Sequence, residues 1–185
     1  PALYDGMYKN ERLPMVQMAE PGKSLRENVD IQIESMQRLS DGMAGMLHPK
    51  ELEIARSLTD VDNLGVDFPE DTNQALMMWL GVVQDQISKR LAAKGEPVPD
   101  LNTVCQTDPV NAVEFLFPHY FLLPYFSSFS AYRIRPLGPE SCLFELWSLT
   151  TYPEGEEPEP PMEPTMLPYN SDQFPPTPRQ DYANI

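Results

Sequence analysis

The sequence predicts an α+β fold, with helices in the first half of the chain and an antiparallel sheet in the second. Apolar residues recur at helical spacing between residues 24 and 95. From residue 112 onward, aromatic and aliphatic residues gather in short runs that turn residues separate. Helices followed by strands, rather than alternating with them, are typical of α+β domains. The 185 residues are enough for one domain with its own core.

Two helices are expected after a surface loop over residues 1–22. Ser24 and Glu27 fit a capping box, in which a hydroxyl and a carboxylate satisfy free amides at a helix start. Apolar residues at helical spacing continue this helix to about Met43. Pro49 can occupy the first turn of the second helix, where its missing N–H costs no hydrogen bond.

A third helix has the clearest pattern in the chain. Asp71 or Thr72 can cap its start, while Gly95 and Pro97 end it. Its apolar face is formed by Leu76, Trp79, Leu80, Val83, Ile87 and Leu91. One continuous face of this kind predicts a long helix packed against a core.

Four strands are predicted, over residues 112–117, 120–125, 130–137 and 142–150. Pro118 and Pro124 interrupt the first two, which places those strands at edges or bulges because proline lacks a donor for the ladder. The last two are joined by a turn at 138–141, so they pair as antiparallel neighbours. The final strand is apolar on both faces, which predicts a central position in the sheet.

The segment 152–178 is rich in proline and glutamate, and nine of the 21 prolines in the chain lie within it. Such a composition favours extended conformations and cannot form a core of its own. The segment is either a free linker or a tether laid along the domain. Residues from Arg179 onward are typical of a helix start, where Asp181 would act as a cap.

Charge and composition restrict the partners. The net charge of −15 argues against nucleic acid or an anionic membrane surface, since both need clustered Lys and Arg. The sequence has no apolar run of the ~20 residues that a membrane span needs. Cys105 and Cys142 have no metal-binding spacing and are expected to be buried free thiols. A cytoplasmic protein is the expectation.

The common catalytic signatures are absent, so the residues alone identify candidates rather than a reaction. His48 precedes a helix and is expected to be exposed, whereas His119 is either a core or rim residue or part of a pocket. The aromatic run around it is either ordinary sheet core or one wall of an apolar cavity facing the third helix. The candidate pocket residues are Trp79, Val83, Phe117, His119 and Phe121.

Three stretches together resemble a known family. They are 114–119 (EFLFPH), 132–147 (YRIRPLGPESCLFELW) and 180–184 (QDYAN). In this order they are similar to the C-terminal catalytic domain of the large subunit of Rieske-type non-haem iron, aromatic-ring-hydroxylating oxygenases. The resemblance covers about residues 110–185, and the helical half is compatible with it.

The resemblance implies a helix-grip (START-like) fold, with a curved antiparallel sheet packed on a long helix. It also implies a mononuclear Fe(II) held by two histidines and one carboxylate, with positions left for O2. Only Asp181 matches such an iron ligand. The histidine pair and the Rieske domain with its [2Fe–2S] cluster are expected before Pro1, the alternative being a degenerate relative that lacks them. Residues 1–185 would then be a partial catalytic domain that is inactive alone.

The implied activity is insertion of O2-derived oxygen into an aromatic or other apolar substrate, as in aromatic hydrocarbon catabolism. A ferredoxin or reductase would supply electrons, and the full subunit would form a homo-oligomer. The alternative is a non-catalytic small-molecule-binding module on a helix-grip scaffold, in which Asp181 is only a helix cap. A third possibility is an interaction protein that docks through its Glu/Pro-rich segment. The substrate cannot be deduced from the sequence.

Overall fold

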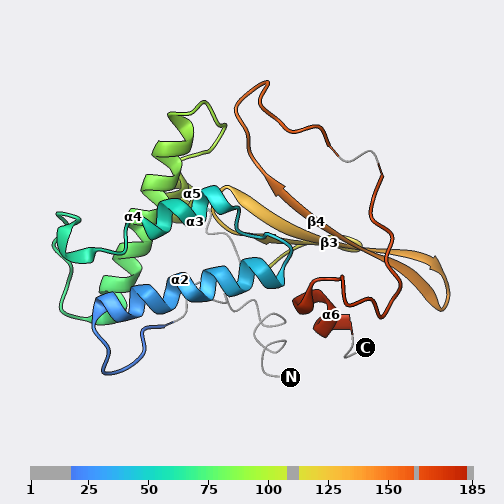
Figure 1. Cartoon of the computed structure of the whole chain (residues 1–185), viewed down its shortest axis with the longest axis horizontal. Coiled ribbons are helices and arrows are strands. Elements are labelled where there is room, and N and C mark those ends of the chain that lie inside the picture. The colour runs from blue at the N-terminus through green and yellow to red at the C-terminus, as the bar shows by residue number, and fades with distance from the viewer. Residues whose placement is uncertain (1–17, 108–112, 161–162, 183–185) are drawn as a thin grey trace.

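The computed structural model describes residues 18–107, 113–160 and 163–182, and these confirm the α+β class (Figure 1). A helical body lies at one end, a sheet extends away from it, and α6 lies beside the sheet. The elements are α2 (Leu25–Gly42), α3 (Pro49–Arg56), η1 (Val61–Asn63), α4 (Thr72–Ala92), α5 (Leu101–Thr107), β1 (Glu114–Leu116), β2 (Tyr120–Pro124), β3 (Ser128–Gly138), β4 (Ser141–Thr150) and α6 (Pro176–Tyr182).

Side-chain caps set the helix starts, as predicted. The Ser24 hydroxyl accepts from the Glu27 amide at 3.3 Å, and the Glu27 carboxylate accepts from the Ser24 amide at 2.8 Å. Asp71 caps α4 by accepting from the Gln74 amide at 2.9 Å. Helix α5 was not predicted, because its seven residues are too few for their apolar spacing to distinguish a helix. It follows Asp100, whose carboxylate accepts from the backbone amides of Asn102 and Thr103 at 3.1 and 3.3 Å.

The main core is helical. The Trp79 side chain is fully buried, and its indole N–H donates to the carbonyl of Leu58 at 2.8 Å. Helix α4 therefore buries its apolar face among the other helices. The core cluster is Val29, Ile33, Met36, Leu47, Leu52, Ile54, Ala55, Leu58, Val61, Leu76, Trp79, Leu80, Val83, Ile87, Leu91 and Leu101.

The described strands form one antiparallel sheet in the order β1-β2-β3-β4. The prediction that the last strand is central was wrong, because β4 lies at an edge of this sheet. Its two apolar faces misled the prediction: one bears Trp147 and Leu149, which are 47% and 44% exposed. Of the predicted interruptions, Pro118 lies between β1 and β2 and Pro124 ends β2.

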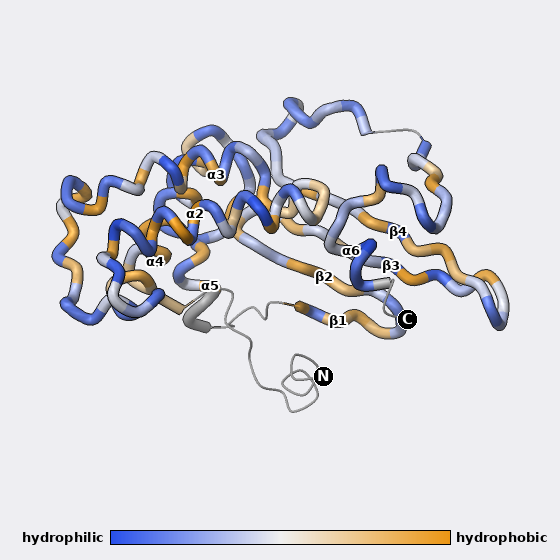
Figure 2. The backbone as a smooth tube through the Cα atoms, turned by 60° about the horizontal axis from the view of Figure 1, so that its bottom comes forward, coloured by the Kyte–Doolittle hydropathy of each residue, from blue (hydrophilic) through white to orange (hydrophobic). Residues whose placement is uncertain are grey.

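Strand alternation divides the sheet into two faces. Ser130 and Ser148, which are paired across β3 and β4, lie on the face toward the loop between α2 and α3. Their hydroxyls donate to the carbonyls of Met43 and Ala44 at 2.9 and 2.6 Å. Figure 2 shows apolar stretches along β2 and β4. Several large apolar side chains of the sheet region are exposed: Phe115, Leu116, Phe117, Leu137, Trp147 and Leu149.

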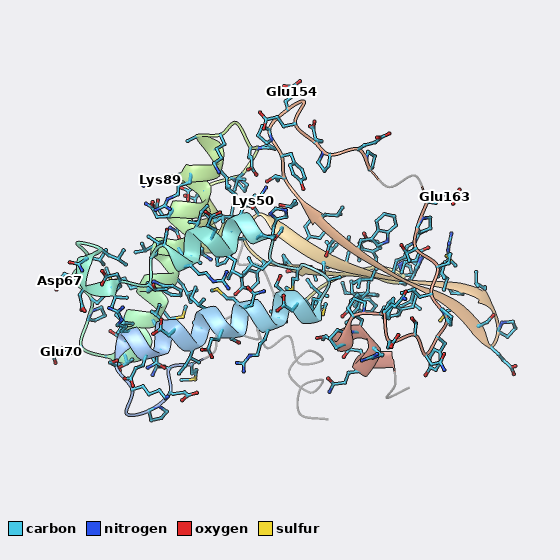
Figure 3. The ribbon with its side chains drawn as sticks, in the orientation of Figure 1. Lys50, Asp67, Glu70, Lys89, Glu154 and Glu163 are labelled. Atoms are coloured by element: carbon cyan, nitrogen blue, oxygen red, sulfur yellow. The ribbon has the colours of Figure 1, made fainter. Side chains whose placement is uncertain are left out.

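The Glu/Pro-rich segment leaves the end of β4, arches away from the sheet and returns to α6 (Figure 1). Its residues 154–160 are exposed, and Figure 3 shows Glu154 at the top of the arch. The segment is thus anchored at both ends: its first part projects from the domain, whereas Phe174 near its end packs against Phe144 of β4. Cys142 is exposed, which corrects the prediction of a buried thiol, and the side chain of Cys105 lies outside the described residues. Within the described part, no helix is long and apolar enough to cross a membrane.

Candidate functional site

The five predicted pocket residues do not come together in one pocket. Trp79 and Val83 are completely buried in the helical core, whereas Phe117 is 89% exposed. His119 is half-buried in the turn between β1 and β2, and Phe121 packs against Phe115 with ring centroids 5.0 Å apart. The prediction failed because the apolar face of α4 is directed at other helices rather than at the sheet.

Asp181 is in the last turn of α6 and does not cap its start, which corrects the sequence-based interpretation. Its carboxylate Oδ2 accepts a hydrogen bond from the Tyr132 hydroxyl at 3.4 Å. The same hydroxyl lies 3.1 Å from the sulfur of Met43, at the end of α2. Asp181 is exposed, while Tyr132 is partly buried. The carboxylate therefore lies at the junction of α6, β3 and the α2–α3 loop.

An aromatic cluster adjoins this carboxylate. The rings of Tyr132 and Phe144 lie 5.0 Å apart on neighbouring strands, and Phe144 meets Phe174 edge-on at 5.9 Å. Two of the three stretches that carry the family resemblance, 132–147 and the segment with Asp181, therefore meet in space. The remaining stretch, 114–119, includes β1, which is separated from β3 by β2, but its last residue reaches β3, because the Ile134 amide donates to the His119 carbonyl at 3.0 Å. Asn184 lies outside the described residues.

Burial raises the pKa of the Tyr132 phenol well above its usual range, and the Asp181 carboxylate raises it further. Burial likewise raises the pKa of Tyr125. Both phenols are therefore neutral at physiological pH. A neutral Tyr132 can donate a hydrogen bond to the Asp181 carboxylate, whereas a tyrosinate would repel that carboxylate.

We expect the free energy of unfolding to fall as the pH rises above about 10, the ordinary tyrosine pKa in the unfolded chain. A folded-state pKa above that value gives a stability contribution that is complete below pH ~10 and is lost toward the folded-state pKa. Urea unfolding of Tyr132→Phe should show a shallower alkaline loss than the parent chain. Tyr169→Phe, at an exposed position, is the control. If the free energy of unfolding falls equally steeply with pH in Tyr132→Phe and Tyr169→Phe, the raised pKa of Tyr132 is contradicted.

Among the described residues, no group of three or more His, Cys, Asp or Glu side chains could hold a metal ion. The side-chain hydrogen bond shown for Asp181 comes from Tyr132. His48 is engaged as a helix cap, because its Nδ1 accepts from the Lys50 amide at 3.3 Å. The described residues therefore do not bring together the ligands of an Fe(II) site.

A buried carboxylate joins the helices to the sheet, and sequence analysis missed it. Glu51 is completely buried at the start of α3. Its Oε1 accepts from the amide of Ser127 and, at 2.6 Å, from the Ser127 hydroxyl. Its Oε2 accepts from the Ser128 hydroxyl and, at 3.1 Å, from the His48 amide. We call these four residues the Glu51 joint; they couple α3 to the turn that begins β3.

A second buried contact lies beside it, where Figure 3 shows Lys50 at the start of α3. Lys50 Nζ lies 2.6 Å from the carboxylate of Glu96, which is 4% exposed, and also donates to the Thr151 carbonyl. The Thr151 hydroxyl donates to the same carboxylate at 2.7 Å. This Lys50–Glu96 pair ties α3, the α4–α5 loop and the end of β4 together.

His48 lies next to both contacts and is half-buried, which corrects the expectation of an exposed residue. Burial and the neighbouring Lys50 ammonium lower its pKa. The neutral ring is the form whose Nδ1 can accept the Lys50 amide. The three polar side chains at this end of α3 therefore have well-defined structural roles.

Comparisons with known proteins give no relative: no protein-family model, curated protein or solved structure matches this chain.

Proposed function

We propose that this chain is part of the C-terminal catalytic domain of a Rieske-type, aromatic-ring-hydroxylating non-haem iron oxygenase. The observation that carries the proposal is the contact between the Tyr132 hydroxyl and the Asp181 carboxylate, at 3.4 Å. These residues belong to two of the stretches that resemble the family, and they are 49 positions apart in the sequence. The aromatic rings of Phe144 and Phe174 line the same region.

In this proposal, Asp181 is the carboxylate ligand of a mononuclear Fe(II), and two histidines from outside this sequence complete the site. Three ligands on one side of the metal leave positions for O2. Tyr132 has a role that follows from its raised pKa, since a neutral phenol can orient the Asp181 carboxylate by donating to it. Because the part of the chain that the structure describes does not bring together a set of iron ligands, no reaction step is assigned to its residues.

The wider expectations belong to the same proposal. The substrate would be an aromatic or other apolar molecule, and electrons would come through a [2Fe–2S] cluster from a ferredoxin or reductase. The full subunit would be a cytoplasmic homo-oligomer with a helix-grip catalytic domain. The exposed Trp147 and Leu149, which alternate onto one face of the edge strand β4, support a sheet that belongs to a larger assembly, because neighbouring exposed apolar side chains often mark a contact surface.

The first test uses the 185-residue chain itself. We expect it to bind Fe(II) no more tightly than an acidic protein without a built site, because one carboxylate gives neither the ligand number nor the geometry for selectivity. Anaerobic titration of the chain and of Asp181→Ala should give indistinguishable weak isotherms, and Asp172→Ala is a matched control at an exposed acidic position. Tight 1:1 binding that Asp181→Ala abolishes would show that the chain already holds a complete site.

A further inference from the structure

A pocket between the end of α2 and the start of α3 is separate from the Asp181 site and shares no residue with it. Its volume is about 380 Å³, at the small end of the range for ligand pockets. It is lined by Gln37, Ser40, Asp41, Gly45, Leu47, Pro49, Leu52 and Arg56. A pocket of this size suits a small metabolite rather than a large cofactor.

The pocket has an apolar floor that is held in place. Leu47 and Leu52 are each only 3% exposed, so they belong to the helical core as well as to the pocket. The Ser40 hydroxyl donates to the Leu47 carbonyl at 2.6 Å and accepts from the Leu47 amide at 3.3 Å. Because these bonds satisfy the hydroxyl, the floor presents aliphatic carbon rather than an unpaired polar group.

The rim carries one positive and one negative group. Arg56 Nη2 donates to Gln37 Oε1 at 2.7 Å, and Gln37 Nε2 donates to Asp41 Oδ1 at 2.7 Å. The side-chain amide of Gln37 therefore bridges the Arg56 guanidinium and the Asp41 carboxylate. Within the described part of the chain, neither Arg56 nor Asp41 forms an ion pair. A guanidinium has five N–H donors and a carboxylate about four acceptor positions, so both keep capacity for a ligand.

We propose that this pocket binds a small aliphatic amino acid. The carboxylate of the ligand would accept from Arg56, its ammonium would donate to Asp41, and its side chain would cover Leu47 and Leu52. A guanidinium matches a carboxylate geometrically because it can donate two parallel hydrogen bonds. A dicarboxylate would be repelled by Asp41, and a simple cation by Arg56. The zwitterion is the class that satisfies both charges and the apolar floor.

The test uses three probes that share the leucine side chain: L-leucine, N-acetyl-L-leucine and L-leucinamide. For a ligand of this size in an open pocket, a dissociation constant of about 1 mM is expected for leucine. N-acetylation removes the ammonium charge and amidation removes the carboxylate charge. Each blocked probe should bind about tenfold more weakly, the usual effect of losing one charge-assisted hydrogen bond. Binding is followed by amide chemical shifts and by calorimetry.

Two variants assign the charges. Arg56→Gln should abolish the preference for leucine over leucinamide, and Asp41→Asn should abolish the preference for leucine over N-acetylleucine. Both side chains are exposed, so the fold should be retained, which circular dichroism checks. Arg38→Gln, at an exposed position of α2 outside the pocket, is the control and should bind as the parent chain does. Equal binding of all three probes, no saturable binding of leucine, or preferences that survive both substitutions would overturn the proposal.

Discussion

Replacing Glu51 with alanine is expected to lower the free energy of unfolding by about 3–5 kcal/mol, a large share of the stability of a small domain. The carboxylate accepts from the amides of His48 and Ser127 and from the hydroxyls of Ser127 and Ser128. The two hydroxyls can turn toward other acceptors, but the Ser127 amide would lose this partner inside the protein. The His48 amide would keep its contact with the Ser128 hydroxyl oxygen at 3.1 Å. Urea unfolding of the parent chain and of Glu51→Ala measures this difference in the free energy of unfolding.

Glu51→Gln separates charge from shape. Each carboxylate oxygen meets one backbone N–H, from Ser127 on Oε1 and from His48 on Oε2. Whichever way the glutamine amide turns, its NH2 group faces an N–H, so a loss of about 1–3 kcal/mol is expected. Glu53→Ala on the exposed side of α3 is the control, and its effect should stay within about 0.5 kcal/mol. If Glu51→Ala and Glu53→Ala lower the free energy of unfolding by equally small amounts, the Glu51 joint does not stabilise the fold.

Lys50→Met is expected to have an effect of similar size, about 3–5 kcal/mol, because it leaves Glu96 buried without its counter-charge. Methionine preserves much of the side-chain length but removes the ammonium that contacts Glu96 and Thr151. The end of β4 should loosen first. Hydrogen exchange near Thr151 should therefore accelerate more than exchange in the middle of α4.

A double-mutant cycle isolates the Lys50–Glu96 interaction. Glu96→Gln in the Lys50→Met background should cost less than the same substitution in the parent chain, since the buried charge no longer needs neutralising. Lys94→Met, at an exposed position two residues before Glu96, is the control. Strictly additive losses would mean that the 2.6 Å contact contributes no coupling energy.

The helices were predictable because their signals are local. The capping box at Ser24, the proline that opens α3 and the apolar face of α4 each depend on residues within a few turns of one another. Strand positions were also predicted, since turn residues bound them. Helix α5 was missed because seven residues are too few for their apolar spacing to distinguish a helix.

The relation between helices and sheet was not predictable in the same way. Apolar residues on both faces of β4 predicted a central strand, yet one face of this edge strand exposes Trp147 and Leu149. The contacts that join the two halves are polar and join residues far apart in the sequence, such as Glu51 with Ser128. A buried glutamate on a helix looks in sequence like any solvent-facing glutamate. Hydrophobic periodicity therefore misses contacts of this kind.

The role of Asp181 as an iron ligand stays a prediction. Asp181 was selected through the family resemblance, and the structure adds its contact with Tyr132, which no spacing rule links to it. The grouping of Trp79 with Phe117 failed, because it assumed that the long helix faces the sheet. The pocket beside Arg56 left no motif, since its lining residues are ordinary helix-surface residues brought together by the α2–α3 connection.

The complete amino-acid sequence of the protein encoded by this gene tests the central claim most directly. The proposal predicts, before the residue numbered Pro1 here, two histidines with four residues between them, preceded by Cys-x-His and Cys-x-x-His pairs that hold a Rieske cluster. Finding both motifs in frame would supply the ligands that Asp181 lacks. A full-length product without any such histidine pair would contradict the oxygenase proposal and leave Asp181 as a partner of Tyr132 alone.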